Sequence, residues 1–141
     1  MPEEIQNEIY LNFKNWKNFR QFRLSDKDNF QVGCIFLKDY SLFGNIYIHL
    51  SSLSVHSNFR NKGLGKRLLL EFNRFVQENN YRSFLEDHLL PSDPSYDIYE
   101  KNGWTSMKNF SPWKSFNIPE DEISELEEVI AKFENGTLKN E

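Results

Sequence analysis

The chain has 141 residues, enough for one domain with a sizeable core but not for two. It is 38% hydrophobic and 16% aromatic, which excludes a disordered chain. The net charge of −4 lies mainly in residues 119–141, and no long basic stripe indicates a nucleic-acid partner. Short apolar runs, an acidic N-terminus unlike a signal peptide and the single Cys34 favour a cytoplasmic protein without a membrane partner or an internal disulfide.

The N-terminal half of the chain has the character of a β-sheet. Short runs rich in Ile, Phe, Val, Leu and Tyr predict strands over 9–13, 18–24, 30–37 and 46–55. The segment Asp39–Asn45, which contains Gly44, predicts a turn. No convincing helix is expected before residue 62.

A basic, glycine-containing segment follows the strand that ends at Leu53-Ser54-Val55. Its sequence is Arg60-Asn61-Lys62-Gly63-Leu64-Gly65-Lys66-Arg67, and apolar residues then recur at helical spacing, predicting a helix over about 63–79. A helix start presents unpaired N–H groups and the positive end of the helix dipole, which makes it an anion site. The two glycines allow turn conformations and close approach of the backbone to a ligand.

Two familiar phosphate loops are excluded at this segment. A Walker loop requires a glycine where Arg60 stands and a Ser or Thr where Arg67 stands. A dinucleotide-binding turn requires a third glycine, and Leu68 occupies that position. The remaining pattern is Arg-x-x-Gly-x-Gly between a strand and an amphipathic helix.

The C-terminal half alternates further strands with helices. Asp93 and Pro94 are suited to the N-cap and first position of a helix that ends at Asn102-Gly103. Pro119 begins an amphipathic helix that Gly136 stops. The strands predicted here are 82–87, 104–110 and 113–118.

A second motif lies about thirty residues after the first. Residues Ser92 to Trp104 match the pattern Asn-Pro-x-x-x-x-Tyr-Glu-Lys-x-Gly-Phe at Pro94, Tyr99, Glu100, Lys101 and Gly103. Asp93 and Trp104 depart from it. With both motifs, in this order and at this separation, the sequence resembles the GNAT family of N-acetyltransferases over residues 46–107.

The resemblance implies a fold and a cofactor. The fold is α/β (α+β): a central mixed, mostly antiparallel sheet of about six to seven strands, splayed in a V and flanked by helices, in one domain over 1–141 with a C-terminal helix at 119–138. The cofactor is acetyl-CoA. Backbone groups of Leu53, Ser54 and Val55 would bind its pantetheine arm. The groups expected at its pyrophosphate belong to Arg60, Asn61, Lys62, Gly63, Leu64, Gly65 and Lys66, with Asp93 at a position that often contacts the cofactor.

The resemblance also implies catalytic roles. Tyr99 matches a tyrosine near the CoA sulfur, where its hydroxyl would donate to the departing thiolate. The alternative for Tyr99 is simple packing. Glu86 is proposed as the general base, although a chain of waters could serve instead. Asp93 as a helix cap is the alternative to cofactor contact, and the spacing of His49, His56 and His88 indicates no metal site.

These patterns predict a cytoplasmic N-acetyltransferase that transfers an acetyl group from acetyl-CoA to a primary amine by direct attack. The acceptor is a small-molecule or peptide amine, with no nucleic acid and no membrane, and the protein is a possible homodimer. Family members usually place helices between their first two strands, and none is predicted here. That departure favours the alternative, a catalytically silent acyl-CoA-binding regulatory module.

Overall fold

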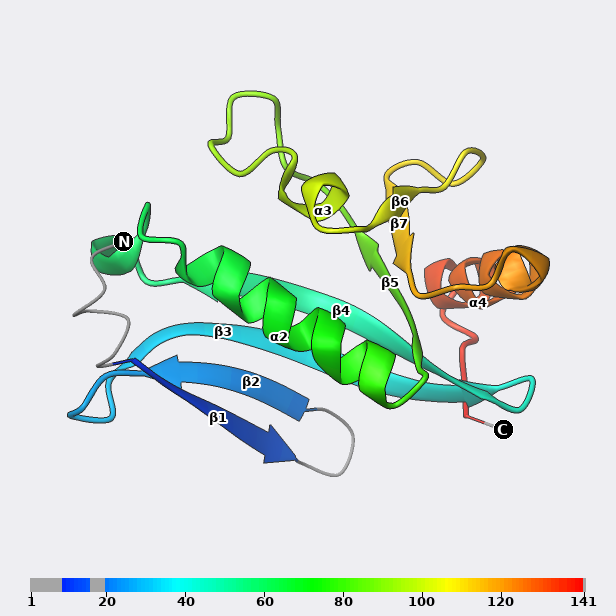
Figure 1. Cartoon of the computed structure of the whole chain (residues 1–141). Helices are drawn as coiled ribbons and strands as arrows, with labels where there is room; N and C mark the ends of the chain where they lie inside the picture. Colours follow the sequence, from blue (N-terminus) through cyan, green and yellow to red (C-terminus); the bar gives the residue numbers. More distant parts are fainter. Residues whose placement is uncertain (1–8, 16–19, 141) are drawn as a thin grey trace. The chain divides into compact units, whose positions relative to one another are not determined.

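A computed structural model describes residues 9–15 and 20–140. Within these residues, seven strands hydrogen-bond in the order β1-β2-β3-β4-β5-β7-β6, and Figure 1 labels them. The strands are β1 (Tyr10–Asn15), β2 (Arg20–Ser25), β3 (Gln31–Leu42), β4 (Asn45–Val55), β5 (Arg82–Glu86), β6 (Thr105–Ser106) and β7 (Trp113–Phe116). The helices are η1 (Ser57–Phe59), α2 (Leu64–Glu78), α3 (Ile98–Lys101), η2 (Glu120–Glu122) and α4 (Ile123–Glu134).

The pairing of the strands is mixed. β4 and β5 pair in parallel, whereas β1–β2, β2–β3, β5–β7 and β6–β7 are antiparallel. The predicted mostly antiparallel sheet of six to seven strands, flanked by helices, is confirmed. The β4–β5 ladder comprises three residue pairs and stops at His49–Phe84, six residues before β4 ends. The V-shaped opening stays a prediction.

The chain divides into two compact units, which are described separately. One runs to Lys38 and resumes with Leu50–Phe75, and the other contains Asp39–His49 and Val76 onward. The single-domain organisation over 1–141 therefore stays a prediction.

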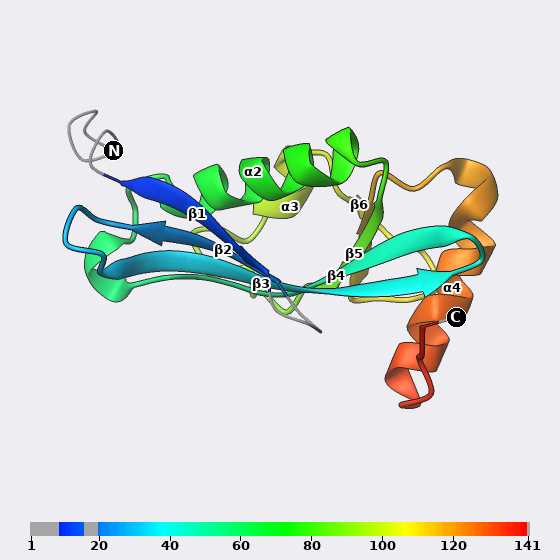
Figure 2. The same cartoon turned by 90° about the horizontal axis from the view of Figure 1, so that it is seen from below.

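In the first unit, the leading turns of α2 cover one face of β2 and β3 (Figure 2). The Phe22 ring meets Phe72 and Phe75 edge-on, at centroid distances of 6.5 and 5.4 Å. Gly33 makes this packing close, because a Cβ there would lie 3.1 Å from the Ser54 carbonyl oxygen and 3.2 Å from Leu68 Cδ1. A strand glycine at this point marks a tight helix–strand approach.

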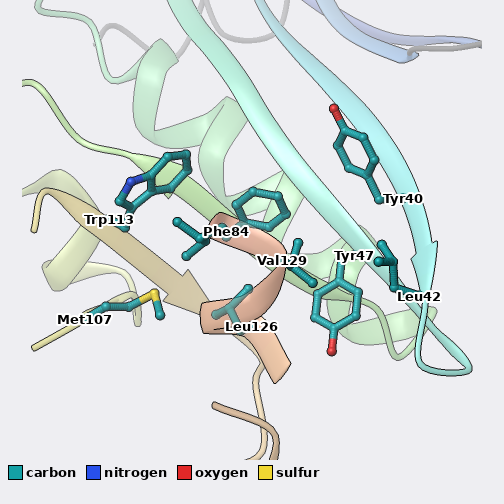
Figure 3. Close-up of a cluster of buried hydrophobic side chains, with 9 residues drawn as sticks. Tyr40, Leu42, Tyr47, Phe84, Met107, Trp113, Leu126 and Val129 are labelled. Carbon is teal, nitrogen blue, oxygen red and sulfur yellow. The ribbon is translucent and has the colours of Figure 1, made fainter. Parts of the chain in front are cut away.

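In the second unit, α4 closes an aromatic core (Figure 3). Its buried residues Leu126, Val129 and Ile130 share a cluster with Tyr47, Phe84 and Trp113. The predicted apolar face of the last helix is thus a packing face. None of the helices in the described part of the chain has the length and apolar character needed to cross a membrane.

The bounds of three predicted elements in this unit are wrong. The segment Asp39–Asn45 is not one turn, because β3 continues to Leu42 with Tyr40 and Leu42 buried, and only Phe43-Gly44 turn, both at positive φ. The predicted strands over 104–110 and 113–118 shrink to β6 and β7, since the intervening residues form a turn in which the Trp113 N–H donates to the Phe110 carbonyl at 2.6 Å.

Candidate functional site

The basic segment forms the connection between β4 and α2, in the first unit. The His56 N–H donates to the Val32 carbonyl at 2.8 Å, which holds the end of β4 beside β3. Arg60 Nε donates to the Val55 carbonyl at 3.1 Å and so folds the connection back on the strand. Asn61 and Gly63 then adopt positive φ, at 62° and 78°. The predicted strand–turn–helix arrangement is confirmed, with α2 beginning at Leu64.

The backbone amides of this turn precede the hydrogen-bond ladder of the helix. The first helical bond runs from the Arg67 N–H to the Gly63 carbonyl at 3.1 Å. The amides of Leu64, Gly65 and Lys66 therefore have no carbonyl partner one turn earlier within the helix. Such amides, at the positive end of a helix dipole, bind anions.

The charges around this turn are arranged against the stability of the helix. The first turn of α2 contains no acidic residue, and it carries Lys66 and Arg67 instead. A cation at a helix N-terminus is unfavourable by about 0.3–1 kcal/mol, because it meets the positive end of the dipole. A bound anion would interact favourably with both the cations and the positive end of the helix dipole. The arrangement therefore fits a phosphate-bearing ligand.

The two glycines of the turn serve different purposes. At Gly63 a Cβ would meet nothing within 4 Å, so glycine is needed for its positive φ, and the backbone stays open to a ligand. At Gly65 a Cβ would lie 3.7 Å from Leu53 and 3.8 Å from Val55, where the helix meets β4. The open backbone at Gly63 and the surrounding cations are features of an anion-binding site.

Tyr99 lies on α3 in the second unit, with its ring buried. It is 9% exposed, and its ring meets Trp104 edge-on at 5.9 Å. Over the described residues its hydroxyl makes no hydrogen bond. Burial, with the negative charge of Asp87, raises the pKa of Tyr99 to about 12. The phenol is therefore protonated at neutral pH and can donate a hydrogen bond.

The helix that carries Tyr99 is much shorter than predicted. It spans only Ile98–Lys101, and residues 93–97 form turns instead. Asp93 as its N-cap is wrong, because the Asp93 carboxylate accepts from the Leu90 N–H at 2.6 Å, closing the turn before it. Consecutive turns from Leu90 to Ile98 take up the polar and proline residues that suggested a helix start.

Glu86 does not lie beside Tyr99. Side chains alternate along β5, and Phe84 and Glu86 share the α4 face, whereas Leu85 and Asp87 point to the other face. Glu86 Oε1 instead lies 3.3 Å from His88 Nε2. The role of Glu86 as the base stays a prediction.

Sequence reasoning missed an ion-pair cluster beside Tyr99. Lys114 Nζ lies 2.8 Å from Asp87 Oδ2 and 2.8 Å from Glu100 Oε1. The only indication of this cluster in the sequence was Lys114, a charged residue within the largely apolar strand Trp113–Phe116. Elsewhere in the described ranges, His49 is enclosed by the rings of Phe84, Trp113 and Phe133, and no group of three or more His, Cys, Asp or Glu is placed to hold a metal ion.

The predicted site residues thus fall into two groups. Leu53–Val55 and Arg60–Lys66 lie together in the first unit, and Glu86, Asp93 and Tyr99 belong to the second.

Comparisons with known proteins identify the family. Residues 20–106 match the family model described as an acetyltransferase (GNAT) domain. No curated protein has a sequence that matches.

Solved structures give the same fold at low identity. The KacTA–DNA complex aligns with a TM-score of 0.59 at 18% identity, over 81% of this chain and 76% of that one. A GNAT acetyltransferase from Staphylococcus aureus Mu50 aligns at 0.54 and 20%, over 70% and 66%. PaiA N-acetyltransferase from Thermoplasma acidophilum, in complex with coenzyme A, aligns at 0.55 and 22%, over 70% and 60%. For the last two, the alignment covers less than two thirds of the other chain.

Proposed function

We infer that this chain, which belongs to the GNAT family of acetyltransferases, transfers an acetyl group from acetyl-CoA to a primary amine by direct attack. The observation that carries the proposal is the turn between β4 and α2. It combines open backbone at Gly63, amides ahead of the helical ladder and cations where helix stability favours acids.

The turn would hold the coenzyme through its diphosphate. The amides of residues 61–66 and the side chains of Arg60, Lys62 and Lys66 supply donors and charge. Backbone groups of Leu53, Ser54 and Val55 would hold the pantetheine arm. Asp93 is different, because its carboxylate already closes a turn and its charge would repel phosphate, so any contact it makes would be to another part of the coenzyme.

The reaction forms one C–N bond and breaks one C–S bond. Bound acetyl-CoA supplies an activated thioester, and holding it beside the amine removes much of the entropic barrier. Because the Glu86 side chain lies on the face of β5 opposite to Asp87, a chain of waters, ending at Glu86 or at solvent, would take the proton that the amine loses. Tyr99 would donate a hydrogen bond to the departing sulfur.

The pKa of Tyr99 defines what that donor can do. A phenol with a pKa of about 12 lies well above a thiol at about 8.5, so complete proton transfer to the thiolate is uphill by roughly 5 kcal/mol. Tyr99 therefore stabilises the developing negative charge as a hydrogen-bond donor. The proton that the thiolate finally takes up is the one released by the amine.

Calorimetric titration tests the binding half of the proposal. Acetyl-CoA should bind in the micromolar range, and S-acetylpantetheine, which lacks the diphosphate, should bind far more weakly. Equal affinity for the two ligands would contradict the role of the turn.

Thiol release tests the transfer half. With a panel of small amines and peptides, free CoA should appear only with an acceptor, and mass spectrometry should find no acetylated enzyme. An acetyl-enzyme that forms without an acceptor would contradict direct attack.

One observation favours the alternative, an acyl-CoA-binding module without turnover. β1 ends at Asn15 and β2 begins at Arg20, whereas family members usually place one or two helices between their first two strands. A chain that binds acetyl-CoA but releases no thiol with any amine would support the module. The expectation of no nucleic-acid partner also stays a prediction, since the KacTA neighbour was solved with DNA.

A further inference from the structure

An ion-pair cluster with two nearly buried members, Lys114 and Asp87, and one half-exposed member, Glu100, joins three elements of the second unit next to Tyr99. Lys114 of β7 bridges Asp87, which follows β5, and Glu100, which follows Tyr99 on α3. The side chains of Lys114 and Asp87 are only 12% and 5% exposed. Burial lowers the pKa of the Lys114 ammonium, but the hydrogen bonds and charges of its two partners raise it on balance, so the ammonium stays charged.

Such a cluster is a poor way to gain stability. Removing two charges from water costs several kcal/mol, and apolar side chains of similar size often serve stability as well or better. What a charge bridge provides is a defined geometry, since one ammonium must reach both carboxylates at once. The bridge therefore indicates that a neighbouring element has a position that must be fixed.

The element that needs support is α3. It has four residues, too few for a helix that is stable by itself, and its N-cap residue Asp97 makes no side-chain capping bond. Its place on the β5–β7 pair therefore depends on a few contacts. The Trp104 ring packs on Tyr99, and Lys114 holds Glu100.

We propose that Lys114 is a positioning residue for acetyl transfer: by bridging Asp87 and Glu100, it fixes α3 on the sheet and so fixes the direction of the Tyr99 hydroxyl. The proposal rests on the proposed function for the role of that hydroxyl. Lys114 also neutralises Asp87, whose charge would otherwise oppose a developing thiolate near Tyr99.

The first test is structural and does not need turnover. Tyrosine ring signals are recorded by NMR with ring-labelled protein, and Tyr99 is assigned by its loss in Tyr99→Phe. In Lys114→Met the Tyr99 signal should shift or broaden, whereas in Lys114→Arg it should stay near the wild-type position. The matched control is Lys101→Met, which removes an exposed ion pair with Asp97 on the same helix. An unchanged Tyr99 signal in Lys114→Met would overturn the proposal.

The second test is kinetic. Lys114→Met should lower kcat by roughly 10- to 100-fold, because a small misplacement of a reacting group is costly, with little change in the affinity for acetyl-CoA. In a Tyr99→Phe background, the same substitution should have almost no further effect on kcat. An equal loss in both backgrounds would show that Lys114 does not act through Tyr99, and would overturn the proposal.

A double variant separates positioning from folding. Asp87→Asn combined with Lys114→Met leaves no unpaired buried carboxylate, so it should fold even if the single variant does not, and it should still disturb the Tyr99 signal. Recovery of the wild-type signal in this double variant would count against the bridge. A wild-type chain that binds no acetyl-CoA and releases no thiol would reject the proposed function, but the NMR result would still decide the role of Lys114.

Discussion

Reversing the charge of Lys66 should change stability and binding in opposite directions. Lys66 is exposed in the first turn of α2, where a cation faces the positive end of the helix dipole. In Lys66→Glu an unfavourable charge is replaced by a favourable one, and each change is worth about 0.3–1 kcal/mol. The free protein should therefore gain about 0.6–2 kcal/mol, which raises Tm by about 2–8 °C.

The same substitution should weaken the binding of acetyl-CoA. The charge changes by two units, and at a distance of about 6–8 Å from a phosphate charge and an effective dielectric of about 40–60 this change is worth about 1.4–2.8 kcal/mol. The dissociation constant should therefore rise about 10- to 100-fold, and the difference should shrink as salt is added.

Calorimetric titration and thermal unfolding of the free protein measure the two effects. The matched control is Gln77→Glu, at the exposed C-terminal end of the same helix, where a new negative charge meets the negative end of the dipole. It should lower Tm slightly and leave binding unchanged. A Lys66→Glu protein that binds acetyl-CoA as tightly as wild type would refute the anion site. A lowered Tm would refute the dipole argument.

Three further predictions follow from the packing. Gly33→Ala should lower the free energy of unfolding by about 1–3 kcal/mol, measured in urea, because its Cβ would clash with a backbone oxygen. In Gly65→Ala the new Cβ would make only ordinary contacts, so the free energy of unfolding should stay unchanged or rise by up to about 1 kcal/mol. Leu126 is fully buried, so Leu126→Ala should lower the free energy of unfolding by about 2–5 kcal/mol. The control is Glu128→Ala at an exposed position of the same helix, whose free energy of unfolding should stay within about 0.5 kcal/mol of wild type. The pKa of Tyr99 is about 12 in the folded chain, against an ordinary value of 10 for a free tyrosine, so the unfolded chain loses this proton first as the pH rises. The free energy of unfolding should therefore fall by up to about 3 kcal/mol between pH 10 and pH 12. The fall should be smaller in Tyr99→Phe, and equal falls in the two proteins would contradict the assignment.

The anion turn could be predicted from sequence because everything that determines it is local. A strand end, two residues at positive φ, the cations and a helix start all lie within Leu53–Arg67. Each is marked by residue type, and the following apolar period confirms where the helix begins. The need for glycine at position 33 could not be predicted from sequence, because the atoms that leave no room for a side chain belong to Ser54 and Leu68 on other elements.

The bounds that failed did so where tertiary burial overrode local composition. Asp39 and Ser41 looked like part of a turn, yet they are the less buried residues of a strand in which the alternate residues Tyr40 and Leu42 are buried. In the turn itself Phe43 has a positive φ. An Asn or Gly at that position would have indicated the turn from sequence, because these residues favour positive φ in hairpin turns. Composition could not reveal a strand that continues through polar residues.

The cluster at Lys114 shows why the second half of the site was beyond sequence reasoning. Glu100 precedes Lys114 by 14 residues and Asp87 precedes it by 27, and the three meet because the strand register pairs Leu85 with Lys114. Two features of this chain place charged side chains where the stability of the free protein would favour others. Helix α2 carries cations where stability favours acids, and one-turn α3 is held by charges where stability favours apolar contacts. Places where a sequence departs from the rules of local stability are expected at functional sites. Here both departures fall in the two motifs that carry the resemblance to the family, one at the turn proposed for the diphosphate and one at the tyrosine proposed for the sulfur.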